Sequence, residues 1–209
     1  AFHRALAATI GQEVRLPSGV SAVALLEREI KLAHERLRQE GVEYPEIDIR
    51  KMWAAVLASL AKDGFAAGRL GGDKVEELGL RYELAVNPVW PMPGAERVIR
   101  ELCRRGFALG IVSNAQCYTR LLFPALLAAT PADLGFDREL CVWSYEHGHG
   151  KPSPRLYQVA EETLAGRGVA ARQILFVGND MLNDITPAAA RGWRTALFAG
   201  DTRSLRLRE

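Results

Sequence analysis

Three short apolar segments of this chain are each followed by polar side chains that could act on a phosphate group. In chain order these side chains belong to Ser113 and Asn114, to Lys151, and to Asn179, Asp180 and Asp184. A hydroxyl and the backbone amides that begin a helix can bond phosphate oxygens. A lysine offsets the negative charge of the phosphate, and carboxylates supply the oxygen ligands that Mg²⁺ prefers. Together these groups predict a site for a phosphate and a divalent cation.

Each group also has a simpler explanation when it is taken alone. Ser113 and Asn114 could cap a helix, and Lys151 could be an ordinary surface lysine. Asp180 and Asp184 could favour a helix N-terminus through the helix dipole. The three groups nevertheless follow three successive predicted strands, and ligands of parallel sheets bind beyond the carboxyl ends of the strands. The combination therefore favours one shared site.

The residues after position 86 alternate between short apolar segments and helical patterns. Strands are predicted at 108–112, 140–143, 174–177 and 195–198. One of the intervening helices is predicted to begin at Ser153-Pro154, a pair typical of a helix cap and first turn. Short continuous apolar strands that alternate with helices indicate a parallel sheet covered on both faces, which is an α/β fold.

The residues before position 86 show helical patterns only. Apolar residues recur at steps of three and four along 20–40, and the pattern repeats along 50–62. Asp73 is predicted to cap a third helix that runs towards Asn87-Pro88. This half of the chain is therefore expected to be a small helical bundle.

The composition is ordinary for a globular protein, with 48% hydrophobic and 25% charged residues. The 27 basic and 25 acidic residues leave a net charge of +2, which is too balanced to indicate binding to nucleic acid or to a membrane surface. Three scattered cysteines indicate reduced thiols and a cytoplasmic protein. No apolar run is long enough to cross a bilayer. Three basic residues near the end are expected to be solvated: Arg203, Arg206 and Arg208. Three tryptophans are expected in the core: Trp53, Trp90 and Trp193.

Four segments resemble, in order and spacing, the second, third and fourth motifs of the haloacid dehalogenase superfamily. They are Pro91-Met-Pro-Gly94, Gly110-Ile-Val-Ser-Asn114, Gly150-Lys-Pro-Ser-Pro154 and Val177-Gly-Asn-Asp-x3-Asp184. The resemblance implies a Rossmannoid three-layer α/β/α core with a parallel sheet, and a small all-helical cap inserted after the first strand. On this basis, residues 1–86 are expected to be the cap domain and 87–209 the core domain.

The resemblance also implies how the residues would act. In the family, an aspartate on the first strand attacks phosphorus and forms an aspartyl-phosphate, and a second aspartate protonates the leaving group. By similarity, Ser113 and Asn114 would bind the transferring phosphoryl group, and Lys151 would neutralise both this group and the nucleophile. The residues after the fourth strand of the family fold would hold Mg²⁺. The expected activity is Mg²⁺-dependent hydrolysis of a small phosphorylated metabolite.

Two features depart from the family pattern. No D-x-D-x-[TV] motif precedes the helical half, so the first strand and its nucleophile are expected upstream of Ala1, and the 209 residues alone are expected to be inactive. The last strand of the family fold is likewise expected outside the chain. Asn179 stands where an aspartate is commoner; it can still offer a carbonyl oxygen to Mg²⁺, while Asp180 or Asp184 would carry the charge.

Several alternatives stay open. A 2-haloacid dehalogenase would share Ser113 and Lys151 but needs no metal, and the acids at 180–184 argue against it. A phosphosugar mutase would use the same ligands, and a catalytically silent relative would account for the absent first motif. His147 and His149 could bind a transition metal, although the glycines around them favour a loop that bends beside the site. Substrate identity and oligomeric state are left open.

Overall fold

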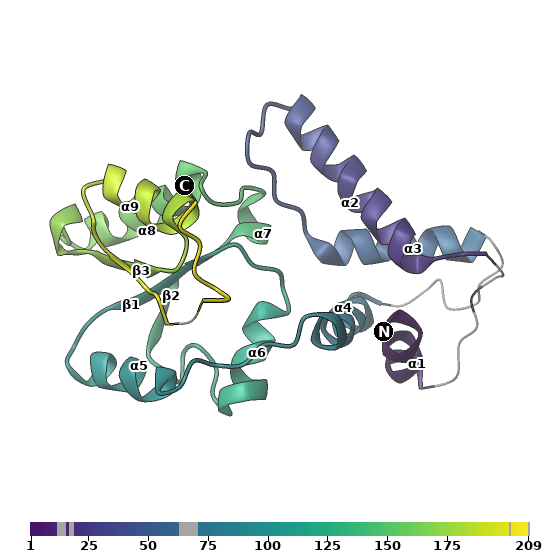
Figure 1. Cartoon of the computed structure of the whole chain (residues 1–209), viewed down its shortest axis with the longest axis horizontal. Helices are drawn as coiled ribbons and strands as arrows, with labels where there is room; N and C mark the ends of the chain where they lie inside the picture. Colours follow the sequence, from purple (N-terminus) through teal and green to yellow (C-terminus); the bar gives the residue numbers. More distant parts are fainter. Residues whose placement is uncertain (12–15, 17–18, 63–70, 201, 209) are drawn as a thin grey trace.

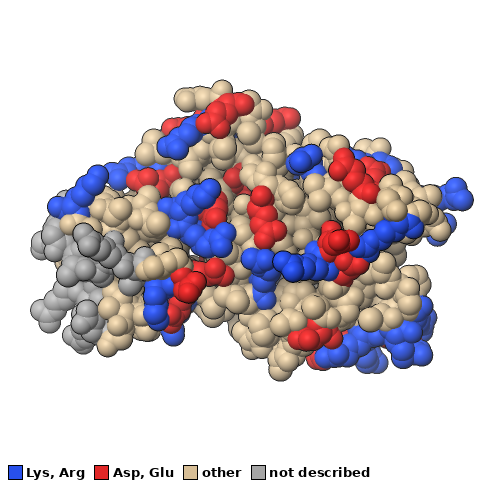
Figure 2. All heavy atoms as spheres, turned by 180° about the vertical axis from the view of Figure 1, so that it is seen from behind, with Lys and Arg blue, Asp and Glu red and all other residues tan. Residues whose placement is uncertain are grey.

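The computed structural model describes residues 1–11, 16, 19–62, 71–200 and 202–208. Helices of the first half lie on one side of the molecule, and the strands with their covering helices lie on the other (Figure 1). The α/β class predicted from the sequence is confirmed, since the second half combines helices with parallel strands. Acidic and basic side chains are mixed over the face shown in Figure 2.

The described part of the first half is helical, as predicted. Its helices are α1 (Phe2–Ile10), α2 (Ala22–Gln39), α3 (Ile49–Lys62) and α4 (Gly72–Val86). Ser21 caps α2, because its hydroxyl accepts a hydrogen bond from the Ala24 amide at 3.2 Å. The prediction that Asp73 caps α4 is wrong: Gly71 occupies the cap, and Asp73 lies in the first turn, where its charge still suits the helix dipole.

Strands and helices alternate in the second half. The helices are α5 (Ala95–Arg104), α6 (Thr119–Leu127), α7 (Ser144–His147), α8 (Pro154–Gly166) and α9 (Thr186–Ala190), with the shorter turns η1 (Ala171–Gln173) and η2 (Met181–Ile185). The strands are β1 (Leu109–Ser113), β2 (Phe136–Trp143), β3 (Leu175–Gly178) and β4 (Arg194–Leu197). The predicted cap at Ser153 is confirmed, with its hydroxyl accepting from the Arg155 amide at 3.3 Å.

The strands form two parallel pairs, β1 with β2 and β3 with β4. Within the described residues no ladder of hydrogen bonds joins one pair to the other. β2 begins at Phe136 instead of residue 140, because the charged residues Asp137, Arg138 and Glu139 interrupt the apolar pattern. Asp137 and Glu139 form ion pairs with Arg167 there.

The end of the chain lies against the edge of β3 that faces away from β4. On the β4 side, the Phe198 amide donates to the Gly178 carbonyl at 2.7 Å. Successive carbonyls of a strand point to opposite edges, so the Asn179 carbonyl faces the other edge, where it accepts from the Arg206 amide at 2.8 Å. The Met181 amide donates to the Arg206 carbonyl, also at 2.8 Å. Arg203, Arg206 and Arg208 are nevertheless exposed, as expected of a solvated basic end, and Arg206 is tied to the turn after β3 through its backbone.

Two clusters of buried apolar residues form the core. The first joins the helical half to residues that follow β1 and β2, among them Ala115 and Tyr145. The second lies under β2 and includes Tyr157 and Trp193. Trp53 and Trp193 are buried as predicted, with 1% and 6% exposure, whereas the same prediction for Trp90 is wrong, since this side chain is 71% exposed.

Some apolar side chains lie outside both clusters. On β3, Leu175 and Val177 are 60% and 57% exposed. On α5, Val98 is 53% exposed, and no residue of this helix is buried. One apolar side of β3 and of α5 is thus open to solvent in the described structure.

Cys103, Cys117 and Cys141 are free thiols, and burial raises the pKa of both Cys117 and Cys141 to about 11. No helix of the described residues has the length and apolar character needed to cross a membrane.

Candidate active site

The carboxyl end of β1 carries the predicted hydroxyl and carboxamide. Ser113 is the last residue of β1, and its hydroxyl donates to the carbonyl of Asn114 at 3.4 Å. The Asn114 side chain reaches the backbone of Lys151 in both directions: its Oδ1 accepts from the Lys151 amide at 2.6 Å, and its Nδ2 donates to the Lys151 carbonyl at 3.2 Å. Asn114 therefore fastens the segment that carries Lys151 to the end of β1.

The Lys151 side chain runs from the end of β1 to the turn after β3. Its Nζ donates to the Val112 carbonyl at 3.1 Å and to Asp184 Oδ1 at 2.5 Å. The ammonium also lies 5.8 Å from the centre of the Phe176 ring. With 12% of the Lys151 side chain and 6% of the Asp184 side chain exposed, this is a mostly buried ion pair.

Asp184 is held by the turn that follows β3. Its Oδ2 accepts from the amides of Asn179 and Asp180, at 3.0 Å each. The carboxylate comes so close to β3 that a Cβ added to Gly178 would lie 2.3 Å from the Asp184 Cβ. Only glycine fits at position 178 without displacing Asp184.

Asp180 caps the turn η2. Its Oδ1 accepts from the amides of Leu182 and Asn183 at 3.0 Å, and its Oδ2 accepts from Arg208 Nη2 at 2.8 Å. Burial opposes ionisation of this carboxyl, but the hydrogen bonds from Arg208 and from the amides outweigh it and lower its pKa below the ordinary value. Asp180 is therefore a carboxylate at neutral pH, neutralised by an arginine from the end of the chain.

The predicted metal ligands are oxygen donors from one short segment. Asp184 and Asp180 are both buried, with 4% and 7% exposure. The side chain of Asn179 donates through Nδ2 to the Ser204 carbonyl, which leaves Asn179 Oδ1 as a potential ligand. This donor set fits a hard divalent cation such as Mg²⁺ in its chemistry. Lys151 and Arg208, however, already neutralise the two carboxylates, so a cation would compete with them.

The structure thus brings some predicted residues together and not others. Asn114, Lys151 and Asp184 form one connected group between the ends of β1 and β3, with Ser113 next to it. The Asp180 carboxylate instead forms its ion pair with Arg208. In the described part of the chain, no three His, Cys, Asp or Glu side chains gather as a metal cluster would, at His147 and His149 or elsewhere.

A second polar network beside the site was not predicted. Gln116 Nε2 donates to Glu46 Oε1 at 3.0 Å and to the Ile47 carbonyl at 2.8 Å. The buried Ser144 hydroxyl donates to Glu46 Oε2 at 2.7 Å and accepts from the Ala115 amide at 2.8 Å. Gln116 and Ser144 both follow strands, which could have drawn attention to them, but Glu46 comes from the helical half and has no sequence signal.

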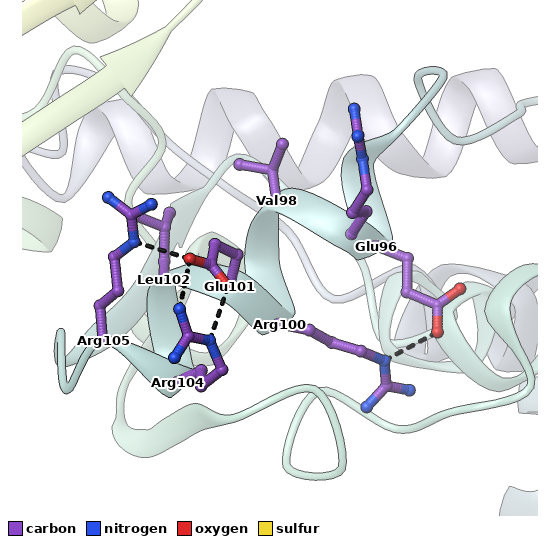
Figure 3. A pocket seen from close by; sticks show the side chains of 8 residues that line it. Glu96, Val98, Arg100, Glu101, Leu102, Arg104 and Arg105 are labelled. Carbon is purple, nitrogen blue, oxygen red and sulfur yellow. Dashed lines mark hydrogen bonds and ion pairs between the residues drawn. The ribbon is translucent and has the colours of Figure 1, made fainter.

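A hollow along α5 is separate from these residues. It has a volume of about 840 Å³ and is lined by α5 side chains, among them the exposed Val98 and Leu102 (Figure 3). Five of its charged side chains form ion pairs with one another: Glu96 with Arg100, and Glu101 with Arg104 and Arg105 (Figure 3). None of the predicted site residues lines it, so it is not the candidate active site.

Comparisons with known proteins bear on the family and the fold of the chain. The family model of the haloacid dehalogenase-like hydrolases matches residues 4–192, and no curated protein matches the chain. A haloacid dehalogenase family enzyme from Bacteroides thetaiotaomicron, solved with magnesium and inorganic phosphate, is 15% identical with a TM-score of 0.50, and the match covers 91% of each chain. A defluorinating L-2-haloacid dehalogenase is 14% identical with a TM-score of 0.48, covering 100% of this chain and 80% of the other. At such identity the first of these shows a shared fold alone.

Proposed function

The chain belongs to the haloacid dehalogenase-like hydrolases, and on this premise we propose that it is a Mg²⁺-dependent phosphatase of a small phosphorylated metabolite. The observation that carries the proposal is the buried contact of Lys151 with Asp184, 2.5 Å long, at the carboxyl ends of β1 and β3. Ligands of parallel α/β sheets bind at such ends. The family enzyme solved with magnesium and phosphate supports the same choice of cofactor and substrate class.

The residues of this chain would act on the phosphoryl group by position and charge. Ser113 would donate a hydrogen bond to a phosphoryl oxygen, and Lys151 would neutralise negative charge that develops there. Asn114 would hold the Lys151 backbone in place through its two hydrogen bonds. Asn179, Asp180 and Asp184 would hold Mg²⁺, which when bound supplies further positive charge to the phosphoryl oxygens.

The nucleophile of this reaction would be an aspartate on a strand upstream of Ala1, which would form the aspartyl-phosphate. Exposed apolar side chains support a further element that packs on this part of the fold: Leu175 and Val177 on β3, and Val98 on α5. A large exposed apolar surface commonly marks a place where a partner packs. We further propose that residues 1–86 form a cap domain over a core domain of 87–209.

A 2-haloacid dehalogenase is the second candidate, and the ion pairs favour it. Lys151 and Arg208 already neutralise Asp184 and Asp180, as would suit a reaction without a metal. Asn179 stands where an aspartate is commoner in the family, so the segment after β3 carries one negative charge fewer for binding a metal.

One assay separates the two candidates. The whole protein, including any residues that precede Ala1, is incubated with p-nitrophenyl phosphate or with a 2-chloro acid, in Mg²⁺ or in EDTA. A phosphatase releases p-nitrophenol only in Mg²⁺. Chloride release that persists in EDTA, without release of p-nitrophenol, would reject the phosphatase in favour of the dehalogenase.

A further inference from the structure

A polar pocket adjoins the candidate active site between the helical half and the loop after β1. Its volume is about 310 Å³, and its lining includes Glu46, Glu83, Leu84, Asn114, Gln116 and Leu122. Asn114 is the residue that fastens Lys151, so this pocket and the candidate active site share a wall. A ligand whose phosphate lay at Lys151 could extend past Asn114 into this space.

The wall that carries Glu46 is tied to the segment that carries Lys151. The Glu46 amide donates to the Gly148 carbonyl at 3.1 Å, and the Gly150 amide donates to the Tyr44 carbonyl at 2.8 Å. The Glu46 carboxylate itself accepts from Gln116, from Ser144 and from the Ile47 amide. These bonds position the carboxylate before any ligand arrives.

The two glutamates leave hydrogen-bond acceptors free in the pocket, whereas the donors of Gln116 are used. Both Nε2 hydrogens of Gln116 are used, by Glu46 and by the Ile47 carbonyl, and its Oε1 accepts from the Ile49 amide at 2.8 Å. Glu83 accepts from Asn87 Nδ2 at 2.8 Å through one oxygen. A carboxylate has about four acceptor sites, so Glu46 keeps about one free site, and Glu83, which also accepts from the Tyr118 hydroxyl, keeps about two.

The two glutamates also leave negative charge in the pocket. Among the described residues, neither Glu46 nor Glu83 forms an ion pair, in contrast to Asp180 and Asp184. Burial and the nearby Glu83 carboxylate raise the pKa of Tyr118, so this phenol of the lining stays protonated and neutral. Leu84 and Leu122 supply apolar wall.

We propose that this pocket binds the leaving group of the substrate and selects an alcohol that carries hydroxyl or ammonium donors and no second negative charge. The inference rests on the proposed phosphatase function and narrows its substrate class to phosphorylated polyols or amino alcohols. Hydroxyl or ammonium groups on such a leaving group would donate hydrogen bonds to the free acceptor sites of Glu46 and Glu83. A second carboxylate or phosphate would meet two like charges and leave those acceptors unpaired.

The test compares three phosphate monoesters of similar size on the whole protein in Mg²⁺: phosphoethanolamine, glycerol phosphate and phosphoglycolate. We expect kcat/KM for at least one of the first two to exceed that for phosphoglycolate by tenfold or more. Phosphoethanolamine above glycerol phosphate assigns the preference to an ammonium group, and the reverse order assigns it to hydroxyls. Phosphoglycolate equal to or better than both would overturn the proposal.

Two variants connect the preference to the pocket. Glu83→Gln, on the surface of α4, and Glu46→Gln should each reduce the ratio of kcat/KM between the preferred ester and phosphoglycolate by about fivefold or more, mainly through KM. The matched control is Glu162→Gln on the exposed side of α8, which should keep the wild-type ratio. An unchanged ratio in both pocket variants would count against the proposal.

A binding measurement keeps this inference separate from the proposed function. If the whole protein releases phosphate from no ester, the phosphatase proposal fails. Saturation-transfer NMR then tests the pocket with the free alcohols ethanolamine, glycerol and glycolate. Contact of ethanolamine or glycerol with the protein that weakens in Glu83→Gln, together with no contact of glycolate, supports the pocket, and any other pattern overturns it.

Discussion

The Lys151 ammonium and the Asp184 carboxylate meet at 2.5 Å, although 33 positions separate them and they follow strands of different pairs. The same Asp184 accepts two backbone amides of the turn after β3, and the same Lys151 donates to the Val112 carbonyl on β1. Since no ladder joins the two strand pairs in the described residues, this ion pair is a direct polar link between them.

Removing the charge of Lys151 should therefore destabilise the fold as well as the site. Lys151→Met leaves the buried Asp184 carboxylate without its cation, and breaking a buried pair in this way costs about 3 kcal/mol or more. Asp184→Asn in the same chain removes the unpaired charge and should restore part of the loss. Urea unfolding of both single variants and the double variant measures the coupling. A coupling below about 0.5 kcal/mol would mean that the two groups act independently.

Much of this site could be predicted because its residues follow strands. Ser113, Lys151 and Asp184 each come after a short apolar run, and parallel strands end at one edge of a sheet. The helices were predictable because their apolar periodicity and their cap signals, such as Ser153-Pro154, lie within a few neighbouring residues. The charged beginning of β2 has no such pattern, so its first residues were missed.

Pairs of polar residues far apart in the chain could not be predicted. Glu46 and Ser144 are 98 positions apart, and Arg208 reaches Asp180 across 28 positions. A hydrogen bond between distant residues imposes no periodicity on the sequence between them. The error at Trp90 has another cause: this large apolar residue was predicted to be buried from its residue type alone.

The close approach of Asp184 to β3 predicts that Gly178→Ala is disruptive. The added methyl group would lie 2.3 Å from the Asp184 Cβ, and crowding of this kind costs about 1–3 kcal/mol or more. The matched control is Gly166→Ala at the end of α8, where a Cβ meets nothing within 4 Å. Thermal unfolding should show a large loss for the first variant and none for the second. Equal melting temperatures for the two variants would contradict the placement of Asp184 against β3.

The lowered pKa of Asp180 predicts a specific dependence of stability on pH. A carboxyl with a depressed pKa stabilises the fold fully above its unfolded pKa, about 3.9, and loses this contribution as the pH falls through the lower folded pKa. Asp180→Asn keeps a capping oxygen but removes the titration. The difference in unfolding free energy between wild type and variant should be constant near neutral pH and shrink below about pH 4. A difference that stays constant down to pH 2 would contradict the role of Arg208 and the amides.

The buried Ser144 hydroxyl predicts a cost for its removal. Ser144→Ala leaves the Ala115 amide without its acceptor and Glu46 without one donor, and an unsatisfied buried polar group costs about 1–3 kcal/mol. Thr163→Ala is the control, because its hydroxyl bonds only a carbonyl of its own helix. Urea unfolding should place the control within about 0.5 kcal/mol of wild type. A similar loss in both variants would show that the network beside the site contributes no special stability.

Arg208 predicts a competition with the proposed Mg²⁺. Its guanidinium lies 2.8 Å from Asp180 and is 46% exposed, so solvent screens the pair and the competition is weak. Arg208→Ala should therefore raise the affinity for Mg²⁺ by no more than about fivefold, as measured by isothermal titration at fixed ionic strength. Arg38→Ala, which removes the same charge from the far end of α2, should leave the affinity unchanged. Equal affinity in the wild type and the Arg208 variant would show that Asp180 is not a ligand, because a cation that binds Asp180 must displace the arginine from it.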